Sequence, residues 1–135
     1  MSLDKALAAS QSEIPECVAA GYVDMVSGML LGIRTVDSHP SEVLDLVAAA
    51  TGDLFQGKNI VQVENLFKKS RGLPVDDGQH YFNEVVVFST NLIHVFLRSR
   101  RYPDHAAVFV SRASANVGMV LMKSRAALGP VENAV

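Results

Sequence analysis

The residue types that most often carry out chemistry are few in this sequence, and their spacing does not assemble a reactive site. The four histidines are His39, His80, His94 and His105, with no pair at i,i+4 and no cysteine beside them. Zinc sites are built from such pairs, so we expect no metal. Three of the histidines fall in turns or at element ends, where a solvated side chain is the ordinary explanation. His94 falls inside a predicted strand, where a satisfied sheet residue is commoner than a proton carrier.

Nucleophilic and phosphate-binding motifs are missing as well. Cys17 is the single cysteine, which excludes an internal disulfide and is typical of a reducing compartment. It begins a predicted strand, where a small buried hydrophobe is commoner than a nucleophile. The sequence has no GxxxxGK[ST] and no GxGxxG after a strand, and Asp76-Asp77-Gly78 predicts a turn because a calcium loop is longer. We therefore predict no catalytic residues, no cofactor and no enzymatic activity.

Basic residues gather near the ends of the last predicted strands. Arg98, Arg100, Arg101 and Arg112 could form one patch facing a protein partner, with Tyr102 beside them. Solvated strand ends are the commoner explanation for such residues. Nucleic-acid binding needs a wider basic face than a chain of net charge −2 offers.

Composition places the chain among single globular domains. Its 135 residues suffice for one domain over 1–135, and 49% of them are hydrophobic. Only 19% are charged, which indicates that a partner covers part of the surface. The N-terminus does not resemble a signal peptide and no apolar run is long enough to span a membrane, so we expect a cytoplasmic protein that binds neither membrane nor nucleic acid.

Hydrophobic periodicity predicts an α+β fold. In chain order we expect a helix over Leu3–Ile14, strands over Cys17–Asp24 and Gly28–Val36, a helix over Ser38–Gly57, a further helix from Asn59, strands over Tyr81–Thr90, Leu92–Arg101 and Ala106–Arg112, and a last helix. Ser2 is the expected cap of the first helix, and Ser114 or Asn116 that of the last. Gly129-Pro130 is expected to end the last helix and leave a disordered tail over 129–135.

The central helices have distinct signals. Pro40 suits the first turn of the Ser38–Gly57 helix, and Gly57 suits the residue just after its end. Asn59 and Gln62 have capping-box spacing for the next helix, which Gly72 and Pro74 would end before a loop over Leu73–Gln79. The apolar stripe of the first of these helices consists of Val43, Leu44, Val47, Ala48, Thr51, Leu54 and Phe55.

The strand Tyr81–Thr90 is apolar on both faces. Phe82, Val86 and Phe88 lie on one face and Tyr81, Val85 and Val87 on the other, so helices should cover both sides of the sheet. The strand has neither lysine nor proline, the residues that commonly blunt a sheet edge. If it lies at an edge, it is a candidate for pairing with a second copy.

Several phrases resemble the Roadblock family, also called the dynein light chain Roadblock-type domain. They are the hairpin GYVDMVSGMLLGI, the helix EVLDLVAAATGDLF, the three-stranded meander and the closing SANVGMVLMKSRAAL. The resemblance covers roughly residues 3–128 as an order of elements. One departure is the stretch Lys58–Gln79, which is longer than the usual connection in this family and suggests an inserted helix that could change the partner surface.

The resemblance implies a fold and a role. It implies a five-stranded antiparallel sheet with one long helix on one face and two on the other. Family members form homodimers or heterodimers through the third strand and the long helices, and act as non-enzymatic adaptors or regulators of small Ras-like GTPases. Carried onto this sequence, the interface would comprise Glu84, Val86, Phe88, Leu44, Val47, Thr51, Leu54 and Phe55.

Two alternatives stay open at this stage. A profilin- or PAS-like domain that senses a small molecule would need an apolar cavity with a few polar groups, and His94 and Tyr81 could line one. A hydrolase or transferase is disfavoured because no catalytic constellation is found. A shared fold does not by itself decide among these functions.

Overall fold

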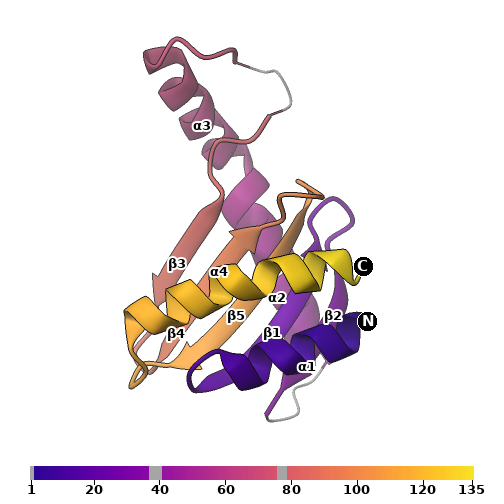
Figure 1. Cartoon of the computed structure of the whole chain (residues 1–135). Coiled ribbons are helices and arrows are strands. Elements are labelled where there is room, and N and C mark those ends of the chain that lie inside the picture. The colour runs from indigo at the N-terminus through magenta and orange to yellow at the C-terminus, as the bar shows by residue number, and fades with distance from the viewer. Residues whose placement is uncertain (1, 37–40, 76–78) are drawn as a thin grey trace.

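The computed structural model describes residues 2–36, 41–75 and 79–135, apart from the side chains of 41–45. The expectations for His39, Pro40 and Asp76-Asp77-Gly78 lie outside these residues. The elements are α1 (Leu3–Glu13), β1 (Cys17–Asp24), β2 (Met29–Thr35), α2 (Ser41–Gln56), α3 (Lys58–Ser70), β3 (Glu84–Phe88), β4 (Leu92–Arg98), β5 (His105–Arg112) and α4 (Val117–Asn133), shown in Figure 1.

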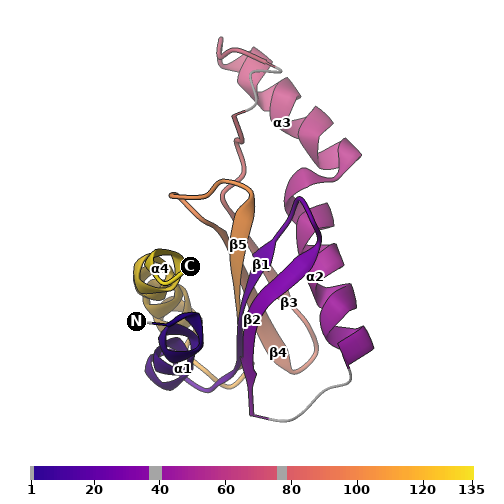
Figure 2. The same ribbon diagram turned by 90° about the vertical axis from the view of Figure 1, so that its right-hand side faces the viewer.

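The five strands form one antiparallel sheet in the order β2-β1-β5-β4-β3, which leaves β3 at an edge. Helices α1 and α4 cover one face, and α2 lies on the other (Figure 2). Below α1 and α4 lies a core that includes Leu7, Tyr22 and Phe109, while Met25 and Phe55 belong to a smaller core below α2. The predicted α+β fold with helices on both faces is therefore confirmed.

The predicted caps of the outer helices are confirmed in their atomic contacts. The Ser2 hydroxyl accepts a hydrogen bond from the Lys5 amide at 3.2 Å, which satisfies one of the free N–H groups of the first turn of α1. Asn116 does the same for the Met119 amide at 3.0 Å and begins α4. In the β1–β2 hairpin, Gly28 has a φ of 72°, a conformation that favours glycine.

The junction between α2 and α3 differs from the prediction. Gly57 has a φ of −59° and is the N-cap of α3, so it is not a left-handed terminating residue. The predicted Asn59–Gln62 capping box is also wrong, because α3 begins before Asn59 and its cap has no side chain. A Cβ at Gly57 would lie 2.7 Å from the Asp53 carbonyl oxygen, so only glycine allows so tight a turn. The turn directs α3 away from the sheet (Figure 1).

The end of α4 is the second correction. The helix does not stop at Gly129-Pro130 but continues to Asn133, and the expected disorder of the tail is wrong at least that far. Proline in a helix interior removes one hydrogen bond and commonly costs about 3 kcal/mol. Burial of Val131 and Glu132 offsets this cost. The Glu132 carboxylate accepts bonds from the Ser99 hydroxyl at 2.5 Å and from the Arg100 amide at 3.0 Å.

We expect Glu132→Ala to lower the free energy of unfolding by about 1.5–3 kcal/mol, because it leaves a buried hydroxyl and the Arg100 amide without their charged acceptor. Urea denaturation monitored by circular dichroism measures the change. Glu13→Ala, at an exposed site at the end of α1, is the matched control and should change it by less than about 0.5 kcal/mol. Equal effects of the two variants would contradict the role given to Glu132.

Candidate functional site

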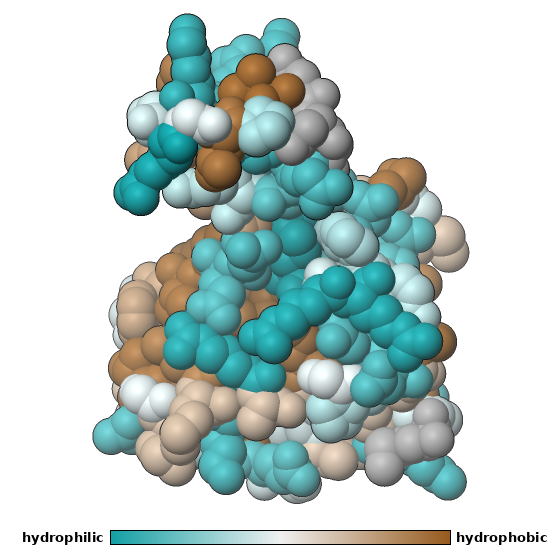
Figure 3. Space-filling view, turned by 45° about the horizontal axis from the view of Figure 1, so that its top comes forward, coloured by the Kyte–Doolittle hydropathy of each residue, from teal (hydrophilic) through white to brown (hydrophobic). Residues whose placement is uncertain are grey.

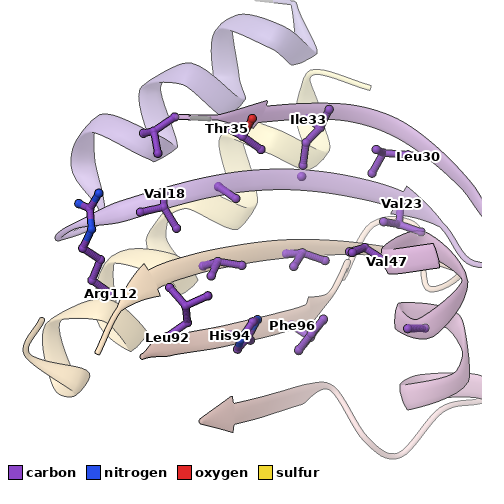
Figure 4. A pocket seen from close by; sticks show the side chains of 16 residues that line it. Val18, Val23, Leu30, Ile33, Thr35, Val47, Leu92, His94, Phe96 and Arg112 are labelled. Carbon is purple, nitrogen blue, oxygen red and sulfur yellow. The ribbon is translucent and has the colours of Figure 1, made fainter. Parts of the chain in front are cut away.

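An apolar groove of about 470 Å³ opens on the face of the sheet that carries α2. Its walls are side chains of β1, β2, β4 and β5, together with Val47 and Ala50 of α2 (Figure 4). Polar side chains contribute little: Thr35 and Arg112 lie toward one end, and His94 lies beside Phe96 within it. The groove is thus an exposed continuation of the smaller core.

The groove exists because the apolar stripe of α2 is used unevenly. Thr51 and Phe55, in the second half of the helix, are completely buried against the chain's own core. In the first half of the stripe, by contrast, Val47 is 39% exposed, and Leu46, on the other side of the helix, is 70% exposed. Apolar side chains that remain uncovered in this way are typical of surfaces that bind a partner.

These burial values correct part of the expected interface. Thr51 and Phe55 cannot contact a second copy, whereas Val47 can; Leu54 is half-buried and the Leu44 side chain lies outside the described part. Sequence reasoning missed Leu46, which belongs to the opposite side of the helix from the stripe. The sequence did contain a signal for Leu46. It forms an apolar pair at i,i+4 with Ala50, on the side of the helix that was expected to face solvent.

The free edge of β3 presents its backbone in a defined pattern. The Ser89 amide donates to the Leu92 carbonyl at 2.9 Å, and the Arg98 amide donates to the Asn83 carbonyl at 2.8 Å. Hydrogen-bonded positions alternate along an antiparallel pair, so odd-numbered residues of β3 direct their N–H and C=O groups toward β4. The backbone groups of Glu84, Val86 and Phe88 therefore point away from the sheet.

The side chains of this edge differ in their availability. Glu84 forms a two-pronged ion pair with Arg125 of α4, at 2.9 and 2.8 Å. Val86 packs against the larger core, while Phe88 is 61% exposed. None of the three residues is a lysine or proline, so the edge lacks these common blocks to further strand pairing.

Arg98 does not belong to a surface patch. It is only 4% exposed, and its guanidinium donates to the carbonyl oxygens of Phe82 at 2.9 Å, Pro103 at 2.9 Å and Phe55 at 3.1 Å. Burial lowers the pKa of Arg98 from its ordinary value. The residue holds together the end of α2, the segment before β3 and the β4–β5 turn.

The remaining arginines are also separated. Arg112 pairs with Leu92, whereas Arg98 pairs with Ala106, so Arg112 lies at the opposite end of the sheet from Arg100 and Arg101. The predicted single basic patch is therefore wrong. Arg100 and Arg101 are exposed, and a partner contact there stays a prediction.

The segment that precedes β3 is fixed by a buried carboxylate. Glu64 of α3 is 2% exposed and accepts hydrogen bonds from the amides of Tyr81 at 2.5 Å and Phe82 at 2.8 Å. The Phe82 carbonyl accepts from Arg98, so both backbone groups of Phe82 are occupied. This explains why the strand begins at Glu84 and not at Tyr81 as predicted.

The three histidines in the described part of the chain and the cysteine occupy structural positions. His94 stacks on Phe96 with ring centroids 6.5 Å apart, and its Nε2 lies 3.0 Å from the Ser89 hydroxyl. His105 Nδ1 lies 3.1 Å from the Tyr22 hydroxyl. His80 lies between two carboxylates at 3.8–3.9 Å, and Cys17 is buried. Within residues 2–36, 41–75 and 79–135, no three metal-ligating side chains converge.

Burial shifts the pKa values of three titratable groups, Tyr22, His80 and His94. Desolvation raises the pKa of Tyr22 to about 12 and lowers the pKa of His94. For His80, burial and then the charge of Arg98 lower the pKa. Both histidines are therefore held in the neutral form more strongly in the folded chain than in the unfolded one.

We expect acidification to destabilise the fold through these two histidines. Below the ordinary histidine pKa of 6.5 the unfolded chain binds protons that the folded one resists, so the free energy of unfolding falls with pH. Urea denaturation at about pH 7.5 and about pH 5.5 measures this loss. A His94→Phe variant, which keeps the stacked ring, should lose less stability between these pH values, and an undiminished loss would contradict the assignment.

Comparison with known proteins agrees with this geometry. A Roadblock/LC7 domain from Streptomyces avermitilis superposes with a TM-score of 0.69 and 14% identity, covering 98% of this chain and 97% of that one. MglB of Myxococcus xanthus gives 0.69 and 11%, covering 97% and 92%. Another MglB structure, described as having a tetrameric arrangement, gives 0.67 and 17%, covering 97% and 88%.

Comparison by sequence alone does not detect this similarity. No protein-family model and no curated protein matches it. Among the described residues, no helix is long and apolar enough to cross a membrane. The order of the elements, the five-stranded sheet and the similarity over nearly the whole chain together show that this protein has the Roadblock fold.

Proposed function

We propose that this protein is a non-enzymatic adaptor that forms a homodimer through β3 and α2 and binds a small Ras-like GTPase. The observation that carries the first part is the row of outward backbone groups at Glu84, Val86 and Phe88. A strand edge of this kind pairs readily with another strand. A second copy can supply that strand, with closed two-fold symmetry.

The free backbone groups favour one register. Pairing Val86 with Val86 of the second copy places Glu84 opposite Phe88 and gives about six hydrogen bonds across the two-fold axis. A shift that extends the pairing beyond Glu84 gains nothing, because both backbone groups of Phe82 are occupied by Glu64 and Arg98. In this register the α2 faces of both copies lie on the same side, so each α2 can approach the other copy's groove.

Amide hydrogen exchange tests the pairing. We expect the amides of Val86 and Phe88 to be protected, since they would donate to the second copy. The amide of Ile33 is the control, because it lies at the other edge of the sheet, on β2. The Val36 amide donates to the Val18 carbonyl and the hydrogen-bonded positions alternate along the pair, so the Ile33 amide points away from β1. Exchange at Val86 as fast as at Ile33, in concentrated protein, would contradict the proposal.

The GTPase part rests on the resemblance of the sequence to the Roadblock family and on the Roadblock fold of the chain. Its test is calorimetric titration with a purified Ras-like GTPase of the same organism, loaded with GDP or with a non-hydrolysable GTP analogue. The proposal predicts binding that depends on the nucleotide. If every Ras-like GTPase of the organism gives equal or undetectable heats in both nucleotide forms, the proposed GTPase binding is wrong. The proposal of self-association is not affected by that result.

A second candidate function is the sensing of a small apolar molecule. The groove volume of about 470 Å³ falls in the range of ligand sites, and His94 lines it as expected. Tyr81 does not, because it stacks on Phe67 of α3 at 6.0 Å between ring centroids. Native mass spectrometry distinguishes the two functions: a co-purified molecule favours the sensor, and a ligand-free dimer favours the adaptor.

A further inference from the structure

Helix α3 carries an apolar surface that its own chain leaves open. Three large side chains are exposed along it: Val63 at 38%, Leu66 at 67% and Phe67 at 45%. Phe67 belongs to an aromatic cluster with Tyr81 and Phe82, whose ring centroids lie 5.9–6.1 Å apart. We call α3 together with this cluster the arm. Exposed apolar surface on so short a segment indicates that something covers it.

The arm has a fixed position relative to the strand edge. The buried carboxylate of Glu64 holds the amides of Tyr81 and Phe82, and Lys68 donates to the Gln79 carbonyl. Arg98 ties the same segment to the body through the Phe82 carbonyl. These charged groups are themselves buried, so the base of the arm is rigidly connected to the start of β3.

The arm also projects on the side where a second copy would lie. It extends past the end of the sheet and leans toward β3 (Figure 1), on the face that carries α2 (Figure 2). The space-filling view, which looks onto the top of the molecule and the face that carries α1 and α4, shows a notch between the arm and the body on the β3 side, with hydrophobic surface below it (Figure 3). Thirteen helical residues give the arm a length of about 20 Å.

We propose that the arm of each copy packs on the β3–β4 turn of the second copy, so that two arms embrace the dimer. This inference rests on the proposed function, because the register of β3 determines what reaches the notch. With Glu84 opposite Phe88 of the second copy, Phe82 is level with Thr90 of that copy. The turn of the second copy, with its exposed Phe88, then meets the aromatic cluster.

This arrangement gives a role to α3 and the segment that connects it to β3. Pairing of two five-residue strands is short, and strand pairs gain most of their stability from apolar cover. With Phe67, Tyr81 and Phe82, the two arms would cover both ends of the paired strands and the exposed Phe88 of each copy. The second copy is the occupant favoured here because its exposed turn is brought to the arm by the backbone register.

Cross-linking between two engineered chains tests the embrace, in full-length protein in which Cys17→Ala removes the natural thiol. One chain carries Val63→Cys on the arm and the other Thr90→Cys in the turn. After mixing, a short bis-maleimide should give a covalent dimer. The control is Lys69→Cys, which lies on the far side of α3 from Phe67. We expect at least about tenfold more product from Val63→Cys than from Lys69→Cys.

A second pair of chains reports on the strand pairing alone. In the proposed register Val85 lies directly opposite Val87 of the second copy, at a non-hydrogen-bonded position with Cα atoms about 4.5 Å apart, which suits a disulfide. Mixed Val85→Cys and Val87→Cys chains should therefore form one on oxidation. If this disulfide forms and Val63→Cys gives no more product than Lys69→Cys, the embrace is wrong and the arm is free for another protein. If neither the disulfide nor the cross-link forms, both the proposed register of β3 and the embrace are wrong.

Discussion

Replacing Arg98 by alanine should lower the free energy of unfolding by about 3–5 kcal/mol, the largest effect expected of any polar substitution in the chain. The change removes three hydrogen bonds from a charged donor and leaves the carbonyl groups of Phe55, Phe82 and Pro103 without that partner. Each such unsatisfied buried group commonly costs about 1–3 kcal/mol. The contact of the guanidinium with the Phe55 ring, 4.8 Å from its centroid, is lost as well.

Urea denaturation with a fitted midpoint and slope measures this loss. Arg98→Lys keeps the charge but not the planar fork, so its stability should fall between those of the natural chain and Arg98→Ala. Arg100→Ala, two residues further on and exposed, is the matched control and should change stability by less than about 0.5 kcal/mol. A loss below about 1 kcal/mol for Arg98→Ala would show that water replaces the guanidinium at these carbonyls.

Replacing Val86 by proline should weaken self-association by about 100-fold or more while leaving the folded monomer nearly unchanged. The Val86 amide points out of the sheet, so proline there removes no bond to β4. It does remove the central donor toward the second copy on both strands and adds a ring at the two-fold axis. A 100-fold change corresponds to about 2.7 kcal/mol, which this loss and the steric clash can supply.

The neighbouring residue provides the control for this variant. The Val87 amide points toward β4, so Val87→Pro should destabilise the monomer itself. Sedimentation equilibrium gives the dissociation constant, and urea denaturation gives the stability of each variant. An unchanged dissociation constant for a well-folded Val86→Pro chain would exclude β3 from the interface.

The regular parts of the fold were predictable because their signals are local. The capping residues Ser2 and Asn116 and the apolar strands can each be recognised from a few neighbouring residues. An end of the first central helix at Gly57 was also predicted, because glycine commonly follows the last residue of a helix. Its detailed geometry was not, because it depends on how closely the backbone of Asp53 approaches.

The other errors share one physical origin, which is tertiary contact between distant segments. Pro130 looks like a helix end until Glu132 is seen to hold the loop after β4. In the sequence, Arg98 resembles a solvated residue at the end of a strand. The three carbonyl groups that it contacts belong to distant segments, so no neighbouring residue indicates them. Glu64 and Lys68 look like a polar helix face, yet both are buried against the segment before β3.

The candidate interface was predicted only in part for the same reason. On β3 the backbone groups of the expected residues Glu84, Val86 and Phe88 point away from β4, and their part in an interface stays a prediction. On α2 the expected stripe includes Thr51 and Phe55, which the chain buries for itself, and it omits Leu46. A sequence pattern shows that a helix has an apolar stripe but not whether its own sheet or a second copy covers each part.

The mass of the natural chain in solution tests the central claim most directly. Sedimentation velocity and light scattering at micromolar concentrations should give a particle of twice the 14.5 kDa chain mass. On dilution the dimer should dissociate, because its interface is a short strand pair with apolar cover. A particle of 14.5 kDa at every concentration in this range would contradict self-association through β3, and the embrace by the arm with it.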